Sequence, residues 1–177
     1  MSINIQHFKT PYGELILGEY NDKICLCDWR YRKMRQAIDD RIQEGLQATF
    51  ELKQTALIIE TQLQLEEYFR KQRTNFELPL LLIGTTFQKS VWNELLKIPY
   101  GKTETYMSLS HKLNNTKAIR AVAAANGANA ISIIVPCHRI VGSNGELVGY
   151  AGGVDVKQKL LRLENSANYA EQLKLFN

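Results

Sequence analysis

Apolar and polar residues alternate in three short runs along the first thirty positions of the chain. The alternating apolar residues are Ile3 and Ile5, Leu15 and Leu17, and Ile24 and Leu26. A period of two is typical of strands with one buried face, and turn-forming residues at 10–13 and 21–22 separate the runs. We therefore predict a β meander over 3–30, in which Cys25 and Cys27 share a face as packing residues.

A period near 3.6 replaces this alternation in the rest of the first half. Residues 31–53 are mostly polar, with a short helix predicted over 36–47. A clearer amphipathic helix is predicted over 55–71, because its apolar residues fall on one stripe. An extended connection around Pro79 follows, and we place a domain boundary there. The first domain, 1–82, is predicted to be an α+β unit without a catalytic motif.

The second half contains the pattern of a helix–turn–helix. Two helices are predicted over 106–113 and 117–126, and an amphipathic helix precedes the pair. A final helix is predicted over 154–165. Together with a short sheet, these helices would form a second domain over 83–165, followed by a tail at 166–177.

The second helix of the pair is rich in alanine and therefore thin. Small side chains let a backbone approach a groove or another helix closely, so tight packing in a core is one interpretation. Lys117 and Arg120 project from this helix, and cations next to a helix–turn–helix favour contact with DNA.

Residues 131–145 contain the candidate chemistry. The apolar run 131–135 is predicted to be a buried strand that Pro136 ends, because proline has no N–H for strand pairing. A nucleophile, a titratable base and a fixed cation follow, in the order Cys137, His138 and Arg139. A buried cysteine beside a surface His-Arg pair is the structural alternative. Three reactive residue types interrupting an apolar run together favour a functional site.

The chemistry of Cys137 requires a base. A thiol attacks as its thiolate, and a free cysteine is mostly protonated at neutral pH. Neighbouring residues on an extended chain point to opposite faces, so we expect a water to bridge Cys137 and His138. A histidine base needs a carboxylate to orient it, and Glu164 at the end of the final helix is a candidate. A solvated acid is the alternative interpretation of Glu164.

Charge is unevenly distributed along the chain. The formal net charge is +4, and residues 84–165 contain ten Lys/Arg against five Asp/Glu. An excess of cations in the half with the candidate site indicates an anionic partner such as nucleic acid, although a basic soluble surface would look the same.

The cysteine count bears on the compartment. Three cysteines are too few, and odd in number, for a disulfide framework, which favours a reducing compartment. No apolar run has the length of a membrane span, and the first residues lack a secretory signal pattern. We therefore expect a cytoplasmic protein with no membrane association. The residue pattern predicts no metal site and no cofactor.

The segment Pro136-Cys137-His138-Arg139-Ile140, followed by Gly149-Tyr150-Ala151-Gly152-Gly153, resembles the O6-alkylguanine-DNA alkyltransferases, also called methylated-DNA–protein-cysteine methyltransferases. Their signature is PCHRV, from which this chain departs at Ile140. The resemblance is close over 84–165 and loose over the first half. It implies a ribonuclease-H-like first domain without catalysis and a helical, winged-helix-like second domain with the helix–turn–helix.

The resemblance also implies residue roles in catalysis. Cys137 matches the alkyl acceptor, His138 the base that activates it through a water, and Glu164 the carboxylate that orients this histidine. Asn129 matches the asparagine that braces the turn next to the active site. Tyr106 matches the tyrosine that helps rotate the nucleotide and lies near O6 of the base.

Further residues are implied to contact DNA and the base. Arg120 matches the arginine that fills the space left in the base stack by the flipped nucleotide. It lies on the helix that enters the minor groove in the family. The other predicted DNA-binding residues are Lys117, Ala121, Ala125 and Arg139. The residues predicted to wall the base pocket are Val148, Gly149, Tyr150, Ala151 and Gly152. Ala151 stands where some relatives have serine, so preference among bulky lesions is expected to differ.

The implied function is direct-reversal DNA repair by a monomer acting on double-stranded DNA. The protein is expected to transfer a methyl or alkyl group from O6-alkylguanine, and from O4-alkylthymine, irreversibly to its own Cys137 after flipping the nucleotide. One alternative is an alkyltransferase-like lesion binder, but such proteins lack this cysteine. Another is a cysteine hydrolase, but its nucleophile usually starts a helix. A zinc site at Cys137 and His138 lacks further ligands.

Overall fold

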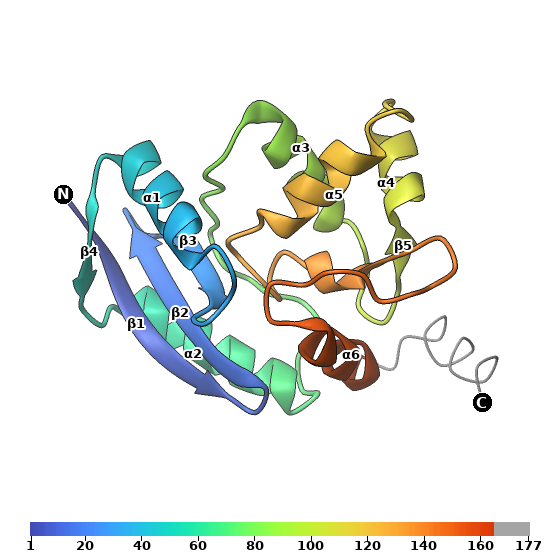
Figure 1. Cartoon of the computed structure of the whole chain (residues 1–177). Coiled ribbons are helices and arrows are strands. Elements are labelled where there is room, and N and C mark those ends of the chain that lie inside the picture. The colour runs from blue at the N-terminus through green and yellow to red at the C-terminus, as the bar shows by residue number, and fades with distance from the viewer. Residues whose placement is uncertain (165–177) are drawn as a thin grey trace. The chain divides into compact units, whose positions relative to one another are not determined.

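A computed structural model describes residues 1–164 of the chain (Figure 1), so the predicted tail 166–177 lies outside the described residues. The residues form two compact units. The first comprises Met1–Thr85 together with Ala130–Ile134, and the second comprises Thr86–Asn129 and the chain from Val135 onward. The division follows Thr85, three residues after the boundary proposed from the sequence, and it assigns 130–134 to the first unit.

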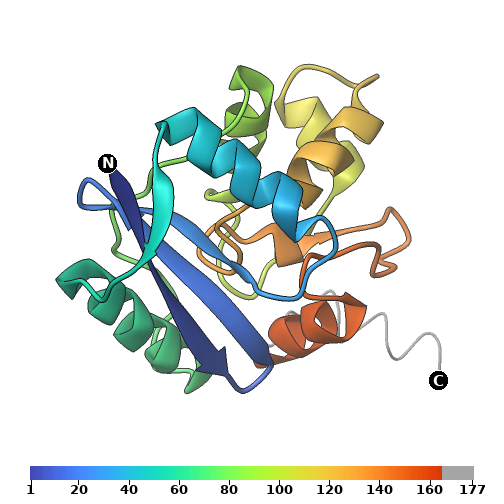
Figure 2. The same cartoon turned by 60° about the vertical axis from the view of Figure 1, so that its left-hand side comes forward.

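The first unit is a four-stranded sheet with one helix against each face (Figures 1 and 2). The elements are β1 (Ser2–Thr10), β2 (Gly13–Tyr20), β3 (Lys23–Trp29), α1 (Arg35–Leu46), β4 (Thr49–Leu52) and α2 (Ala56–Phe69). The strand order is β3-β2-β1-β4, with β4 parallel to β1 and the other pairs antiparallel. The three antiparallel strands confirm the predicted meander.

The predicted helices are present, whereas β4 was not predicted. Thr55 caps α2, and its side chain accepts a hydrogen bond from the Ile58 backbone N–H at 3.2 Å. Three of the four residues of β4 are exposed, so its sequence lacks the apolar alternation that marks the other strands. A short exposed edge strand is detected only through its pairing with β1.

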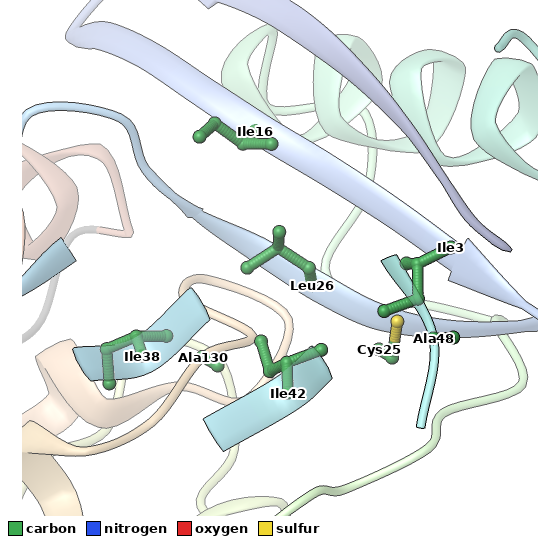
Figure 3. Close-up of a cluster of buried hydrophobic side chains, with 8 residues drawn as sticks. All are labelled: Ile3, Ile16, Cys25, Leu26, Ile38, Ile42, Ala48 and Ala130. Atoms are coloured by element: carbon green, nitrogen blue, oxygen red, sulfur yellow. The ribbon is translucent and has the colours of Figure 1, made fainter. Parts of the chain in front are cut away.

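A cluster of buried residues joins α1 to one face of the sheet (Figure 3). Its members come from β1, β2, β3, α1 and two neighbouring segments: Ile3, Ile16, Cys25, Leu26, Ile38, Ile42, Ala48 and Ala130. Leu15 and Leu17 alternate with Ile16 and are also buried, so β2 is covered on both faces.

Cys25 and Cys27 do not share a face, which corrects the sequence-based prediction. The pairing of β2 with β3 shifts between Gly18 and Glu19, and Cys25 is the extra residue. Cys25 therefore packs beside Leu26, whereas Cys27 pairs with Leu17 on the opposite face. Both thiols are buried and not in disulfides, in agreement with packing residues.

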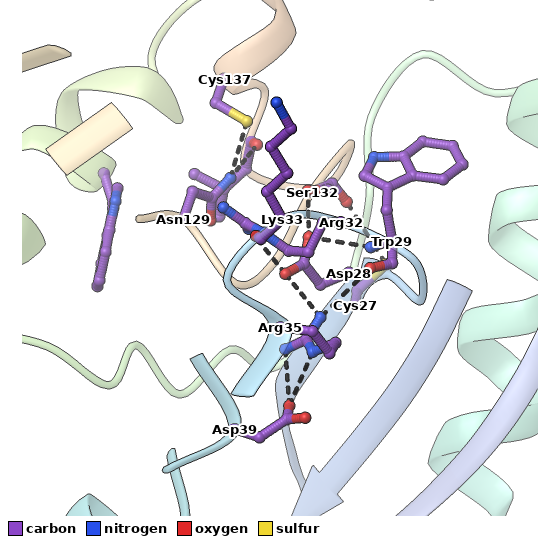
Figure 4. A network of polar contacts seen from close by, with 12 residues as sticks. Cys27, Asp28, Trp29, Arg32, Lys33, Arg35, Asp39, Asn129, Ser132 and Cys137 are labelled. Atoms are coloured by element: carbon purple, nitrogen blue, oxygen red, sulfur yellow. Dashed lines mark hydrogen bonds and ion pairs between the residues drawn. The ribbon is translucent and has the colours of Figure 1, made fainter. Parts of the chain in front are cut away.

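A buried carboxylate, Asp28, organises the end of β3 (Figure 4). Its Oδ2 accepts hydrogen bonds from Arg32 at 2.8 Å and Arg35 at 2.9 Å, and its Oδ1 accepts one from Ser132 at 3.0 Å. Because these partners are charged or polar and lie within hydrogen-bond distance, this buried charge is compensated.

The second unit is mainly helical. Its elements are α3 (Thr86–Leu95), β5 (Glu104–Thr105), α4 (Tyr106–Lys112), α5 (Ile119–Gly127), the 3₁₀ turn η1 (Cys137–Arg139), β6 (Ile140–Val141) and α6 (Val154–Leu163). The indole N–H of Trp92 donates to the Ala125 carbonyl at 2.8 Å, which ties α3 to α5. The α+β class predicted from the sequence is confirmed, and the predicted helix–turn–helix corresponds to α4 and α5.

Residues 131–135 are buried as predicted, but they are not a regular strand. Ile131 and Val135 lie in bridges on either side of a turn, and Ile133 has a φ of 72°. The Ile134 N–H donates to the Ser132 carbonyl at 2.9 Å, so the turn is only three residues wide. A β-branched residue at positive φ is strained, and such strain persists only where the surroundings enforce it.

Within residues 1–164, no helix combines the length and the apolar character needed to cross a membrane.

Candidate active site

The turn that carries Cys137 is held by backbone hydrogen bonds on both sides. The Cys137 N–H donates to the Val135 carbonyl at 2.8 Å, around Pro136. The residues Cys137–Arg139 then form η1, and β6 continues from it in parallel pairing with β5. Since Tyr106 begins α4 directly after β5, this pairing brings the start of α4 close to the end of the turn. The conformation also corrects the expected extended chain at Cys137 and His138.

Glu164 receives hydrogen bonds from both residues that follow the cysteine. Its Oε1 lies 2.7 Å from His138 Nε2 and 3.0 Å from Arg139 Nη2. Its Oε2 lies 2.9 Å from Arg139 Nε. Arg139 also donates to the Ile98 carbonyl at 2.6 Å. All three charged or titratable side chains are buried. The alternative that Glu164 is a solvated acid is therefore excluded.

The turn before α4 also contributes to this cluster. The Gly101 N–H donates to Glu164 Oε2 at 3.3 Å. Gly101 has a φ of +74°, and a Cβ there would lie 3.0 Å from the Glu164 carbonyl oxygen. Glycine at this position therefore adopts the positive φ and allows the backbone to approach the main chain of Glu164 closely.

The protonation states follow from these contacts. Burial alone would raise the pKa of Glu164, but the charges and hydrogen bonds of His138 and Arg139 outweigh it and hold this pKa well below its usual range. Burial lowers the pKa of His138, and this effect exceeds the opposing attraction of Glu164. Arg139 carries a permanent charge, so Glu164 stays ionised beside a neutral imidazole.

A neutral His138 has one proton, and Glu164 determines where it lies. A carboxylate only accepts hydrogen bonds, so His138 donates through Nε2 and its Nδ1 is the acceptor. Nδ1 is buried, and no side chain or backbone group in residues 1–164 hydrogen-bonds to it. His138 therefore has the tautomer of a general base, with Nδ1 available for a proton.

The thiol of Cys137 is 3% exposed and is contacted by Asn129 (Figure 4). The Asn129 side-chain amide donates to Cys137 Sγ at 3.2 Å and to the Val135 carbonyl at 2.9 Å. One amide thus connects the sulfur to the backbone just before it. A donor to sulfur stabilises a thiolate more than a thiol.

Tyr106 and Lys157 hold the loop that was predicted to wall the base pocket. The Tyr106 hydroxyl donates to the Val148 carbonyl at 3.2 Å, and Lys157 Nζ donates to the carbonyls of Val148 at 3.1 Å and Gly149 at 3.5 Å. Tyr150 follows in this loop, with its ring centroid 6.4 Å from that of His138. Ala151 and Gly152 are half-buried.

Lys157 was missed by the sequence analysis. It is fully buried, and this burial lowers its pKa to about 8 against an opposing effect of the Cys137 charge. A signal was present in the sequence, because Lys157 is three and four residues before Leu160 and Leu161 and therefore lies on the apolar face of the helix. A cation on an apolar helix face has a specific partner more often than not.

Lys157→Met is expected to loosen the loop at 147–150, because methionine keeps the length of the side chain but removes the donors to both carbonyls. Amide hydrogen exchange in this loop should accelerate by roughly tenfold or more. Lys159→Met, at an exposed position of the same helix, is the control and should leave the loop unchanged. Equal exchange in both variants would show that the Lys157 contacts do not order the loop.

Two residues predicted to bind DNA are internal instead. Arg139 is 6% exposed and pairs with Glu164, so its charge is used within the site. Ala125 is 2% exposed and faces α3, where Trp92 bonds to its carbonyl. The sequence could not distinguish the two faces of an alanine-rich helix. Lys117, Arg120 and Ala121, which were also predicted to bind DNA, are exposed.

The part of the chain from residue 1 to residue 164 contains no group of three or more His, Cys, Asp or Glu side chains arranged to hold a metal ion. The one imidazole in the site instead bonds to Glu164.

Comparison with known proteins places this site in a family. A family model described as "6-O-methylguanine DNA methyltransferase, DNA binding domain" matches residues 86–166. The methylated-DNA–protein-cysteine methyltransferase of Methanosarcina acetivorans is 40% identical over 159 residues, which cover 90% of this chain and 96% of the relative. The constitutive enzyme of that name from Bacillus subtilis is 41% identical over 157 residues, covering 88% and 92%.

Solved structures agree with these matches. The crystal structure of Mycobacterium tuberculosis O6-methylguanine methyltransferase superposes with a TM-score of 0.77 at 34% identity, over 99% of each chain. The crystal structure of Mycobacterium tuberculosis OGT in complex with DNA has a TM-score of 0.77 at 35% identity, over 98% of this chain and 99% of that one. This chain, with its Cys137-His138-Glu164 arrangement, belongs to the methylated-DNA–protein-cysteine methyltransferase family.

Proposed function

We propose that this protein repairs alkylated DNA by moving the alkyl group from O6 of guanine, and from O4 of thymine, onto Cys137. The observation that supports the proposal most is the buried hydrogen bond between Glu164 and His138. It leaves Nδ1 of His138, the residue directly after Cys137, without a hydrogen-bond partner in residues 1–164. No part of this arrangement requires a metal ion, because the sulfur itself is the acceptor. The relatives at 40% and 41% identity bear the corresponding name.

Activation of the thiol would proceed through a water. The Cys137 proton passes by this water to His138 Nδ1, and the imidazolium that forms is stabilised by Glu164 at 2.7 Å. Arg139 keeps Glu164 ionised throughout, so the carboxylate is negatively charged when the His138 imidazolium forms. Asn129 donates to the sulfur at 3.2 Å and favours the thiolate.

The target base must leave the helix before the thiolate can reach it, at a cost of about a few kcal/mol for unstacking. Because Arg120 is exposed on α5, we propose that its side chain fills the space that the flipped base leaves in the stack. We propose that Tyr106 helps to rotate the nucleotide. The exposed Lys117 and Ala121 lie on the same segment, which we propose enters the minor groove of double-stranded DNA. We place the base against the loop Val148–Gly152.

Transfer would be a direct displacement. The thiolate forms a bond from sulfur to the alkyl carbon, the bond from that carbon to O6 breaks, and its electron pair stays on the base. Burial raises the pKa of Tyr106 to about 12, with the Cys137 charge adding to the increase and a hydrogen bond from Asn126 opposing it. Tyr106 therefore keeps its proton at neutral pH, and its hydroxyl can donate to the leaving base once it turns away from the Val148 carbonyl.

Each molecule is expected to act once. The product is a thioether, as inert as that of methionine, and its reversal would need another strong nucleophile. Burial raises the pKa of Cys25 to about 12 and also raises that of Cys27, so neither is a thiolate at neutral pH. We also propose that the protein acts as a monomer in the cytoplasm, where its three thiols stay reduced.

Intact mass spectrometry tests the proposal. After incubation with excess duplex DNA that contains O6-methylguanine, the protein should gain the mass of one methyl group, on the peptide that contains Cys137. Repaired guanine should appear in the DNA in equal amount. Continued loss of O6-methylguanine after every protein molecule is methylated would contradict the single-use scheme, and repair with no mass gain would indicate a hydrolase.

A further inference from the structure

The turn between α3 and β5, residues 98–101, is hydrogen-bonded at both ends to one buried ion pair. Where the turn begins, Nη1 of Arg139 donates to the Ile98 carbonyl at 2.6 Å. Where it ends, the Gly101 N–H donates to Glu164 Oε2 at 3.3 Å. Arg139 and Glu164 are paired with each other, and both are buried. Hydrogen bonds to charged groups are stronger than those between neutral groups, so this pair fixes the turn firmly.

The middle of the turn is held as well. The Tyr100 hydroxyl donates to the Leu163 carbonyl at 3.3 Å, and the Arg139 guanidinium carbon lies 5.9 Å from the centroid of the Tyr100 ring. A guanidinium at this distance is attracted to an aromatic ring. The Lys102 N–H closes the turn by donating to the Pro99 carbonyl at 3.1 Å. Arg139 therefore contacts the turn at its first carbonyl and at its aromatic side chain.

This turn leads directly into α4, the first helix of the helix–turn–helix (Figure 1). Only residues 102–104 lie between Gly101 and Thr105, whose side chain caps α4 by accepting a hydrogen bond from the Ser108 N–H at 3.0 Å. Thr105 also ends β5, which pairs with β6, the strand directly after Arg139. A connection this short transmits a displacement of the turn to the start of the helix.

The guanidinium of Arg139 has no nitrogen to spare for a phosphate. Its Nε and Nη2 donate to Glu164, and its Nη1 donates to the Ile98 carbonyl. The residue is also buried. An effect of Arg139 on DNA binding would therefore have to act through the turn and α4 rather than through a contact with the DNA.

We propose, on the basis of the function proposed above, that Arg139 is a positioning residue for DNA binding. It fixes the turn 98–101, the turn fixes the start of α4, and α4 packs against α5, the helix proposed to enter the minor groove. Arg139 thereby raises the affinity for duplex DNA without contacting a phosphate. Since the same side chain keeps Glu164 ionised, one residue serves both the groups that activate the thiol and the helices that bind DNA.

Arg139→Lys tests this inference. Lysine keeps a positive charge beside Glu164, but its single ammonium replaces the planar fork that reaches Glu164 and the Ile98 carbonyl together. Binding to an undamaged duplex, in which methyl transfer plays no part, would be titrated at several salt concentrations and at a temperature where circular dichroism shows the variant to be folded. The affinity should fall roughly tenfold, as expected for the loss of a charged hydrogen bond. The slope of log affinity against log salt should not change, because no phosphate contact is lost.

Two further variants calibrate this measurement. Arg162→Lys, the same substitution at an exposed position of α6, should leave both the affinity and the slope as they are in the unaltered protein. Lys117→Met removes an exposed cation that is proposed to bind DNA, and it should lower the magnitude of the slope by about one.

An affinity of Arg139→Lys within about twofold of the unaltered protein would overturn the inference, because Arg139 would then serve only the local structure. A slope that decreases by about one would also overturn it, because Arg139 would then contact a phosphate. If this variant does not fold, Tyr100→Phe, which loses only the hydroxyl bonded to Leu163, is judged by the same two measurements, with an expected fall in affinity of roughly three- to fivefold. Failure of the unaltered protein to bind duplex DNA, damaged or undamaged, would instead refute the proposed function itself.

Discussion

Cys137→Ser is expected to abolish methyl transfer while leaving binding to alkylated DNA intact. The hydroxyl of serine ionises far less readily than a thiol and is a weaker nucleophile, so His138 cannot activate it to a comparable degree. The rate should fall by at least roughly 10³-fold, as expected when the atom that forms the new bond is replaced.

The fold should tolerate this change, because the serine oxygen can still accept the hydrogen bond that Asn129 donates to Cys137 Sγ. Transfer would be followed by mass spectrometry and binding by titration with DNA containing O6-methylguanine. Cys25→Ala, at a buried thiol of the first unit, is the control and should retain transfer. Methylation of Cys25 or Cys27 in the Cys137→Ser protein would show that the acceptor has been assigned wrongly.

Glu164→Gln is expected to reduce the free energy of unfolding by about 3–5 kcal/mol, the range for breaking a buried ion pair from one side. Glutamine has nearly the same shape, but it leaves the Arg139 guanidinium buried without its counter-charge. It also removes the anion that stabilises the His138 imidazolium, so methyl transfer by the folded fraction should slow as well.

The expected pH dependence follows from the lowered pKa of Glu164. A carboxyl whose folded pKa lies below its unfolded value stabilises the fold above the unfolded pKa, about 4.3 for glutamate, and loses this contribution as the pH falls further. Urea unfolding at neutral pH should therefore separate the two proteins, and the difference should shrink below about pH 4.

Glu94→Gln is the control, because Glu94 pairs with Lys97 at an exposed site where the ion pair contributes about 1 kcal/mol or less. Equal unfolding free energies for Glu164→Gln and Glu94→Gln at neutral pH would contradict the assignment of Glu164 as a buried counter-charge.

Several features of the fold could be predicted from local sequence alone. The helix α2 was expected because its apolar stripe is a property of consecutive residues. The antiparallel strands β1 to β3 were expected for the same reason, since alternation and turn residues are visible in the chain. The cysteine, its histidine and Glu164 were candidates because of their residue types and through the family resemblance.

Other features depended on residues distant in sequence. The shift between Gly18 and Glu19 moved Cys25 to the face of Leu26, and it arises from pairing with a neighbouring strand. The apolar run before Pro136 predicted burial correctly but not conformation, since a buried segment can turn at Ile133 as well as extend. Arg139 was predicted to contact DNA, whereas its pairing with Glu164, 25 residues further along the chain, is visible only in the tertiary structure.

The sequence by itself determined which residues could react, where the helices and the first three strands lie, and which half of the chain is basic. The tertiary structure alone decided which atoms meet: the carboxylate of Glu164 between His138 and Arg139, the ammonium of Lys157 beneath the loop, and the guanidinium of Arg139 against the Ile98 carbonyl. The physical reason is that hydrogen bonds and ion pairs are formed over about 3 Å, between residues whose separation along the chain carries no information about that distance.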